Sequence, residues 1–150
     1  MSRSHSPHTR KGPMKLRAAV VGCGALAHAT HLPNIATSEE LCLAVACDRD
    51  PDLAEGAGKR FGASRISTDW REVIAAADVD LIVLCTHTNL RADLICPALE
   101  NGKPIYTEKP LADSEAEMLR IYRASQKTRV PVCVGHNRRS APAMLEFRRL

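Results

Sequence analysis

The feature that most constrains this chain is a series of short apolar runs, separated by segments of helix length, that begins at Leu16. The runs expected to be strands are Leu16–Val21, Leu41–Cys47, Arg65–Ser67, Leu81–Cys85, Pro104–Thr107 and Val132–Val134. Runs such as LIVLC are continuously apolar, which is typical of parallel strands buried on both faces. The pattern predicts an α/β fold with a doubly wound parallel sheet of the Rossmann type.

The segments between these runs carry helix-end signals. The first helix is expected to reach about Ile35. The starts of the later helices are indicated by residues that can cap a helix N-terminus, namely Asp50, Asp69 and Asp113 or Ser114. Two helix ends are indicated by glycines, Gly62 and Gly102.

Charge is concentrated at the N-terminus. Residues 1–13 hold three of the 21 basic side chains, no acid, and no apolar residue except Met1, so we expect 1–14 to be a disordered basic tail. The rest of the chain has 18 basic against 17 acidic side chains. This near-neutral body predicts no nucleic-acid partner, although the tail could serve as a partner-binding arm. No apolar run approaches the ~18 residues of a membrane span, so no membrane partner is expected either.

Six cysteines are spread along the chain without a C-x-x-C pair or a zinc-like Cys/His spacing. Most of them fall inside apolar runs. We therefore expect buried, reduced thiols and no metal site. Because the N-terminus also lacks the apolar stretch of a signal peptide, the sequence favours a cytoplasmic location.

A glycine motif follows the first strand directly. Gly22 suits a tight turn, Gly24 would let backbone N–H groups approach a pyrophosphate, and Ala27 takes the third small position, where a helix packs on a strand. The N-terminus of the following helix would add positive partial charge for the phosphates. The motif predicts dinucleotide binding.

Asp48 ends the second strand, near the spacing expected for the acid that binds an adenosine ribose. A carboxylate repels a 2′-phosphate, so Asp48 favours NAD over NADP. Arg49 beside it leaves NADP open, because a guanidinium pairs well with phosphate. Asp48 could also be only a turn residue before the next helix.

Two further segments fall at the same predicted sheet edge. Cys85, Thr86, His87 and Asn89 follow the fourth strand, and Glu108 and Lys109 follow the fifth. Lys109 precedes Pro110, which restricts it to an extended backbone. An ammonium held there could stabilise developing negative charge on a substrate oxygen, or it could be only an exposed charge beside a turn.

Four segments together resemble the nucleotide-binding half of the Gfo/Idh/MocA oxidoreductases, the family of glucose-fructose oxidoreductase and inositol 2-dehydrogenase. They are VVGCGALAHATHLPNI, ACDRD, LENGKPIYTEKPLA and VGHNRRSAPAM. The E-K-P at 108–110 is the most specific of these signals. The resemblance implies an NAD(P)-dependent dehydrogenase that acts on a sugar, polyol or related compound.

The resemblance also implies roles for individual residues. It places Gly22, Gly24 and the Ala25–Leu26 backbone at the pyrophosphate, Asp48 and Arg49 at the adenosine ribose, and Cys85, Thr86, His87 and Asn89 along the cofactor. Glu108 and Lys109 would stand near the nicotinamide, with Lys109 as the catalytic residue and a cis Pro110 fixing their direction. Asn137 matches the N-R that borders the active site. Three positions depart from the family pattern: His87, Arg91 and His136.

Family members continue well beyond this length, so the resemblance implies a nucleotide-binding domain over 15–135 and the start of a truncated substrate domain over 136–150. We expect cofactor binding with little or no turnover from the chain itself, and a homo-oligomer for the complete protein. Met144, Leu145 and Phe147 are expected to form an exposed apolar patch that promotes self-association.

Two other functions stay open at this stage. One is a non-catalytic dinucleotide-binding module that regulates a partner. The other is a methyltransferase-like domain, which also combines a glycine loop with an acid after the second strand, although the E-K-P segment argues against it.

Overall fold

A computed structural model describes residues 14–149, in which six strands form one parallel sheet of order β3-β2-β1-β4-β5-β6. The strands are β1 (Leu16–Val21), β2 (Leu41–Cys47), β3 (Arg65–Ser67), β4 (Leu81–Leu84), β5 (Ile105–Glu108) and β6 (Val132–Gly135). This is the strand order of a Rossmann fold, with the switch point between β1 and β4. The predicted fold class is confirmed, and the expected disordered tail lies outside the described residues except for Met14.

The predicted strands agree with the observed ones to within one residue at each end. β4 ends one residue before the predicted Cys85, while β5 and β6 each extend one residue further than predicted. The two extensions have one cause: Glu108 and Gly135 are register partners, so the pairing of β5 with β6 continues for one more residue in both strands. Glu108 consequently belongs to the sheet and not to the loop after it.

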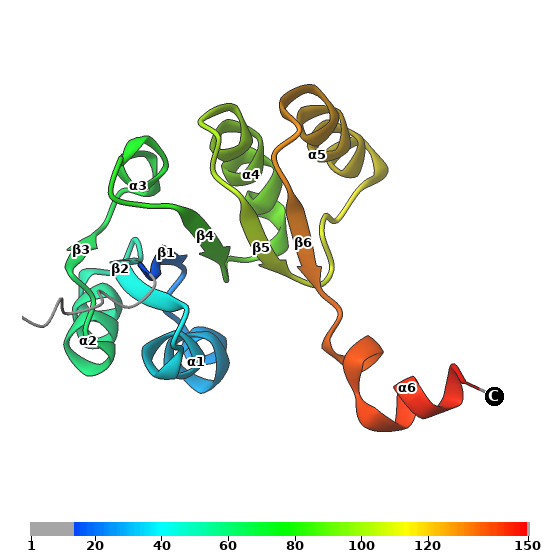
Figure 1. The fold of residues 1–150 in the computed structure, drawn as a ribbon. Coiled ribbons are helices and arrows are strands. Elements are labelled where there is room, and N and C mark those ends of the chain that lie inside the picture. The colour runs from blue at the N-terminus through cyan, green and yellow to red at the C-terminus, as the bar shows by residue number, and fades with distance from the viewer. Residues whose placement is uncertain (1–13, 150) are drawn as a thin grey trace, which may run out of the picture.

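Helices cover both faces of the sheet (Figure 1). They are a π-helical turn at Ala27–His31 that continues into α1 (Leu32–Thr37), then α2 (Pro51–Phe61), α3 (Trp70–Ala75), α4 (Arg91–Glu100), α5 (Glu115–Thr128) and α6 (Pro142–Phe147). α1 and α2 lie on one face, and α3, α4 and α5 lie on the other. This arrangement leaves only the strand ends open for a ligand.

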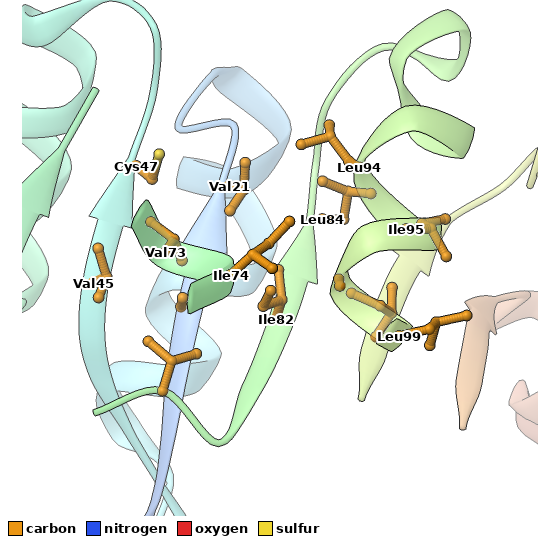
Figure 2. Packing of buried hydrophobic residues seen from close by; sticks show 14 of the residues in the cluster. Val21, Val45, Cys47, Val73, Ile74, Ile82, Leu84, Leu94, Ile95 and Leu99 are labelled. Atoms are coloured by element: carbon orange, nitrogen blue, oxygen red, sulfur yellow. The ribbon is translucent and has the colours of Figure 1, made fainter. Parts of the chain in front are cut away.

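The core is divided into two layers by the sheet, as the continuous apolar runs predict. Within β1, Ala18 and Val20 pack toward α1 and α2, whereas Ala19 and Val21 pack toward α3 and α4. Figure 2 shows the second layer, in which Val73 and Ile74 of α3 and the leucines of α4 lie over the strands. Both faces of the central strands are thereby removed from water.

The predicted helix ends are confirmed where their hydrogen bonds can be followed. The side chains of Asp50, Asp69 and Ser114 each accept a bond from the backbone N–H two or three residues onward. Gly62 ends α2 in the left-handed conformation, with φ of 74°. These local signals fix the lengths of α2, α3 and α5.

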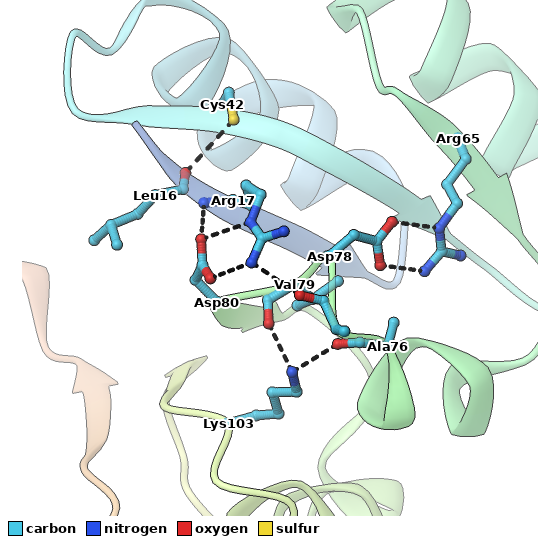
Figure 3. Close-up of polar contacts among 10 residues, drawn as sticks. Leu16, Arg17, Cys42, Arg65, Ala76, Asp78, Val79, Asp80 and Lys103 are labelled. Carbon is cyan, nitrogen blue, oxygen red and sulfur yellow. Dashed lines mark hydrogen bonds and ion pairs between the residues drawn. The ribbon is translucent and has the colours of Figure 1, made fainter. Parts of the chain in front are cut away.

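The amino edge of the sheet is held by ion pairs (Figure 3). The Asp80 carboxylate accepts bonds from the Arg17 backbone N–H at 2.8 Å and from its guanidinium at 2.7 and 3.0 Å. Arg65 forms a second two-bond pair with Asp78, and the Lys103 ammonium donates to two backbone oxygens. Charged side chains therefore close this edge, and the carboxyl edge is left for the site.

α6 extends away from the sheet (Figure 1), and its apolar side chains are exposed. The exposed fractions are 45% for Met144, 45% for Leu145 and 70% for Phe147. The exposed apolar residues expected at this end are confirmed, and the self-association expected from them stays a prediction.

Candidate dinucleotide site

The two glycines after β1 have different physical roles. Gly22 has φ of +93°, and a Cβ on it would lie 2.9 Å from the carbonyl carbon of Cys85. Its backbone therefore passes too close to the end of β4 for any side chain. A Cβ on Gly24 would meet nothing within 4 Å, so this glycine leaves open space beside the loop.

Asp48 joins the glycine loop to the end of β2. Its Oδ2 accepts a bond from the Cys23 backbone N–H at 2.7 Å, and its Oδ1 accepts one from the Asp50 N–H at 3.0 Å. The carboxylate is thus oriented by backbone donors on both sides before any ligand is present. The predicted residue lies beside the glycine loop, and it fixes that loop as well, a role that the spacing alone did not suggest.

A cavity of about 520 Å³ opens at the carboxyl ends of β1, β2 and β4. It is lined by most of the predicted cofactor residues of this region, namely Gly22, Gly24, Asp48, Arg49, Cys85, Thr86 and His87, and also by Leu53, Trp70, Arg71, Leu90 and Leu94. The Arg71 guanidinium stacks over the Trp70 ring, 4.5 Å from its centroid. The lining thus combines glycine backbone, charged side chains and apolar or aromatic side chains.

Thr86 carries a polar atom that bears on ligand binding. Among the described residues, its Oγ1 is a buried side-chain oxygen without a hydrogen-bond partner. Buried hydroxyls are rarely left unpaired, so this one is available for a ligand that enters the cavity. Together with the open space at Gly24, it shows that the residues present fit a dinucleotide.

Three cysteines lie around the cavity, and none of them is a ready nucleophile. Burial raises the pKa of the Cys23, Cys47 and Cys85 thiols to about 12, with added contributions from the nearby Asp48 carboxylate for the first two and from Glu108 for the third. At neutral pH these thiols are protonated and unreactive. Cys23 and Cys47 are buried, as the sequence predicts, and Cys85 is partly buried. The prediction is wrong for Cys133, which is exposed on the last strand of the sheet.

Lys109 lines a second cavity, of about 470 Å³, at the ends of β5 and β6. Its other lining residues are Glu108, Gly135, His136, Asn137, Arg138 and Arg139. Lys109 is exposed, and the Lys109–Pro110 peptide bond is cis. No salt bridge within residues 14–149 involves Lys109, Arg138 or Arg139, so this cavity is strongly cationic.

Beneath Lys109 lies a buried pair that the sequence did not predict. The Oε1 of Glu108 is 3.0 Å from the Nε2 of His31, and both side chains are at most 10% exposed. The Tyr106 ring packs edge-on against His31, and its hydroxyl donates to the Oδ1 of Asn137 at 3.3 Å. The Glu108 carboxylate therefore supports the floor of the site while the next residue, Lys109, faces the cavity.

The remaining predicted residues lie around these cavities. The side chains of Ala25, Leu26 and Asn89 are exposed and line neither one. His87 is exposed at the rim of the larger cavity, and Asn137 borders the smaller one. Arg91, singled out only as a departure from the family pattern, proves to be buried between the two loops. A side chain that reaches across loops in this way leaves no local signal in a sequence.

The described residues also define what the fold lacks. No group of three or more His, Cys, Asp or Glu within residues 14–149 is arranged to hold a metal ion. In the same range, no helix is long and apolar enough to cross a membrane.

The glycine loop, the acid after β2 and the strand order together define an NAD-binding Rossmann domain. Residues 16–136 match the model of the Gfo/Idh/MocA oxidoreductase family, described as an oxidoreductase family with an NAD-binding Rossmann fold. The chain belongs to this family. The resemblance drawn from the four sequence segments is thereby confirmed, as is NAD as the cofactor of the domain.

Relatives and solved structures agree with this assignment. The chain is 32% identical to 4-carboxy-2-hydroxymuconate-6-semialdehyde dehydrogenase of Sphingobium sp. over 85% of its length, and 34% identical to scyllo-inositol 2-dehydrogenase (NAD(+)) of Bacillus subtilis over 90%. It covers 40% of each relative. A structure of an NAD binding oxidoreductase from Klebsiella pneumoniae matches 88% of this chain and 37% of that one, with a TM-score of 0.79 and 27% identity.

A second solved structure bears on the fold alone. Scyllo-inositol dehydrogenase from Lactobacillus casei with bound NAD(H) and scyllo-inositol has a TM-score of 0.85 at 22% identity, over 91% of this chain and 41% of that one. This chain thus spans about two fifths of the length of the proteins it matches. The match to the family model ends at residue 136, near the end of β6.

Proposed function

We propose that this chain is the nucleotide-binding part of an NAD(P)-dependent dehydrogenase that interconverts an alcohol and a carbonyl on a sugar, polyol or related compound. One observation carries the proposal. A glycine-lined cavity with an unpaired buried hydroxyl and a cavity containing Lys109 open at the same carboxyl edge of one sheet. In doubly wound folds this edge is where ligands bind, so cofactor and substrate would meet there.

The residues of the larger cavity would hold the dinucleotide. Gly22, Gly24 and the backbone at Ala25 and Leu26 would lie against the pyrophosphate at a helix N-terminus, where N–H groups favour an anion. Asp48 would accept bonds from the adenosine ribose through lone pairs not used by Cys23 and Asp50. Thr86 would donate its free hydroxyl. The bound nicotinamide supplies the acceptor or donor of hydride.

Lys109 would act on the substrate side. Its ammonium, held on an extended backbone before Pro110, would donate to the reacting oxygen and stabilise the negative charge that develops on it. Glu108 would not touch the substrate directly, because its carboxylate is buried against His31. Its role in the site would be to keep the end of β5, directly before Lys109, in place.

Charge near the ribose end favours NAD over NADP. The Asp48 carboxylate opposes a 2′-phosphate, while Arg49 and Arg71 line the same cavity and would attract one. Arg71 is already stacked on Trp70 and lies 3.4 Å from the Asp69 carboxylate, so part of its charge is compensated. We therefore propose NAD as the preferred cofactor and NADP as a weaker ligand.

A titration of the chain with NADH and NADPH, followed by cofactor fluorescence, tests the proposal. We expect NADH to bind more tightly, and Asp48→Asn to weaken NADH more than NADPH. Asparagine keeps an oxygen that accepts from Cys23, whereas alanine would also release the glycine loop, so Asp48→Asn separates ribose contact from loop support. Failure of the wild-type chain to bind either dinucleotide contradicts the proposal.

Turnover gives the second test. With NAD and polyols such as scyllo-inositol, we expect little or no NADH formation by the chain itself, because its matched relatives are more than twice as long. Activity that disappears in Lys109→Ala would contradict the expected inactivity and support the role of Lys109. NADH binding that alters a partner protein equally in wild type and Lys109→Ala would favour a regulatory module.

A further inference from the structure

Arg91 is an unusual residue in this fold. It is the first residue of α4 and is 5% exposed, and it is the only buried Lys or Arg within residues 14–149. Burial lowers the pKa of its guanidinium, while the nearby Glu108 carboxylate opposes that change. Burying a guanidinium is costly unless its donors are satisfied, so its hydrogen bonds define what it does.

All of these hydrogen bonds go to backbone oxygens at the site, in the loop after β4, at the end of β5 and in the turn that follows β5. The Nε and Nη2 of Arg91 donate to the carbonyl of Thr86 at 3.3 and 3.2 Å. Its Nη1 donates to the carbonyls of Glu108 and Pro110, the residues on either side of Lys109. A planar guanidinium with donors in a fixed fork is suited to bridge acceptors that point from different directions.

We propose that Arg91 is a positioning residue that locks the loop after β4 to the cis-proline turn that carries Lys109. The inference rests on the proposed function, because only that function makes Lys109 the group that faces the substrate. Arg91 lines neither cavity, so it acts only through the loops it holds. Thr86 lines the nucleotide cavity and Lys109 lines the other one, and a single guanidinium fixes the backbone of both segments.

Two consequences follow from this connection. Loss of the Arg91 hydrogen bonds, called the Arg91 fork below, frees the Lys109 turn without disturbing α5. This is expected because α5 begins after the turn and packs on α4 through its own core residue, Ile121. In addition, a ligand that orders Thr86 also restrains the Lys109 turn, even when the ligand is too short to reach Lys109. The nucleotide cavity and the catalytic side are coupled through this side chain.

Hydrogen exchange of the full chain tests the fork directly. We expect Arg91→Lys, which keeps the charge but has no planar fork, to speed amide exchange at Glu108, Lys109 and Leu111 by about tenfold, as the loss of charged hydrogen bonds predicts. Exchange in α5 should not change. The matched control is Arg120→Lys, because Arg120 is exposed and pairs only with Asp93. Unchanged exchange in the turn, or equal acceleration in the turn and α5, overturns the proposal.

Ligand binding supplies a readout that a merely structural role would not move. ADP-ribose lacks the nicotinamide and is coupled to Arg91 only through Thr86, so we expect Arg91→Lys to weaken NADH about tenfold and ADP-ribose by a smaller factor of about threefold. Parallel losses for both ligands overturn the positioning role. In the wild-type chain, saturating ADP-ribose should slow exchange at Lys109 and Leu111, and the absence of slowing overturns the coupling.

The outcomes separate this proposal from the proposed function. A wild-type chain that binds neither NADH nor ADP-ribose contradicts the proposed function, while the exchange comparison of Arg91→Lys with wild type still decides whether the fork holds the turn. If Arg91→Lys does not fold, the wild-type exchange experiment with ADP-ribose decides the proposal alone.

Discussion

The two cavities at the carboxyl edge are built in different ways. The nucleotide cavity is lined by buried residues such as Val21 and Leu94 and by exposed ones such as Arg49 and Arg71. Its key acid, Asp48, is already bonded to two backbone N–H groups. The Lys109 cavity is lined mostly by exposed residues, three of them the cations Lys109, Arg138 and Arg139, and its buried lining residues are Gly135 and Glu108, which pairs with His31. In the first region, backbone hydrogen bonds orient the key side chain, whereas in the second the key side chain, Lys109, is exposed and forms no salt bridge within residues 14–149.

The largest effect expected is on the backbone of the nucleotide cavity. Gly22→Ala places a Cβ 2.9 Å from the carbonyl carbon of Cys85, just after β4, at a positive φ. We therefore expect a loss of about 3 kcal/mol in the free energy of unfolding, measured by urea titration. Gly24→Ala, which meets open space, should stay within about 1 kcal/mol of wild type. Equal losses in the two variants would show that the two glycines do not differ.

The floor of the Lys109 cavity is the next most sensitive point. Glu108→Leu removes the acceptor of the buried His31 bond and should cost about 2 kcal/mol of unfolding free energy. Glu108→Gln keeps an oxygen at the same place and should lose less than half of that. NADH affinity should change little in Glu108→Gln. Similar unfolding midpoints for the two variants would mean that the pair does not support the floor.

Thr86 distinguishes ligand binding from stability. Because its hydroxyl has no partner, Thr86→Val should leave the unfolding free energy within about 0.5 kcal/mol of wild type and weaken NADH about fivefold. The control is Thr107→Val. In the wild-type chain, the Thr107 hydroxyl donates to the Leu84 carbonyl in the core. That variant should lose stability and keep its affinity for NADH. The opposite pattern would assign the free hydroxyl to the fold and not to the ligand.

The smallest effect expected is at the far edge of the sheet. The Arg17 guanidinium and N–H lower the pKa of Asp80 from 3.8 to about 2. A carboxyl group whose pKa is lower in the folded chain than in the unfolded chain stabilises the fold at pH values above its unfolded pKa. That stability is lost as the pH falls from about 4 to 2. The pair is partly exposed, so we expect about 1 kcal/mol. The stability difference between wild type and Asp80→Asn should shrink steadily between pH 4 and 2. A difference that keeps its neutral-pH size at pH 2 contradicts this origin.

The contrast between the two regions also explains what the sequence could predict. The strands, caps and glycine loop are encoded by neighbouring residues, so pattern and spacing located them to within a residue or so. Lys109 gained its proposed role only from the family resemblance, because a lysine before a proline is not distinctive by itself. His31 and Glu108 are 77 positions apart, and the Arg91 fork reaches 19 residues ahead. Contacts between side chains so far apart depend on tertiary packing, which no local pattern reports.

The cysteines offer a practical consequence of the packing. The thiols of Cys47 and Cys85, at the nucleotide cavity, and of Cys23, in the glycine loop, have a pKa of about 12. Cys96 is half-buried with a raised pKa, and the half-buried Cys42 thiol lies 3.7 Å from the Leu16 carbonyl. Cys133 alone among the six is exposed, and it is the register partner of Tyr106 in the neighbouring strand. A maleimide dye should therefore attach selectively to the native chain at Cys133. The molecule carries its own attachment point for a fluorescent reporter, one strand away from the floor of the Lys109 cavity.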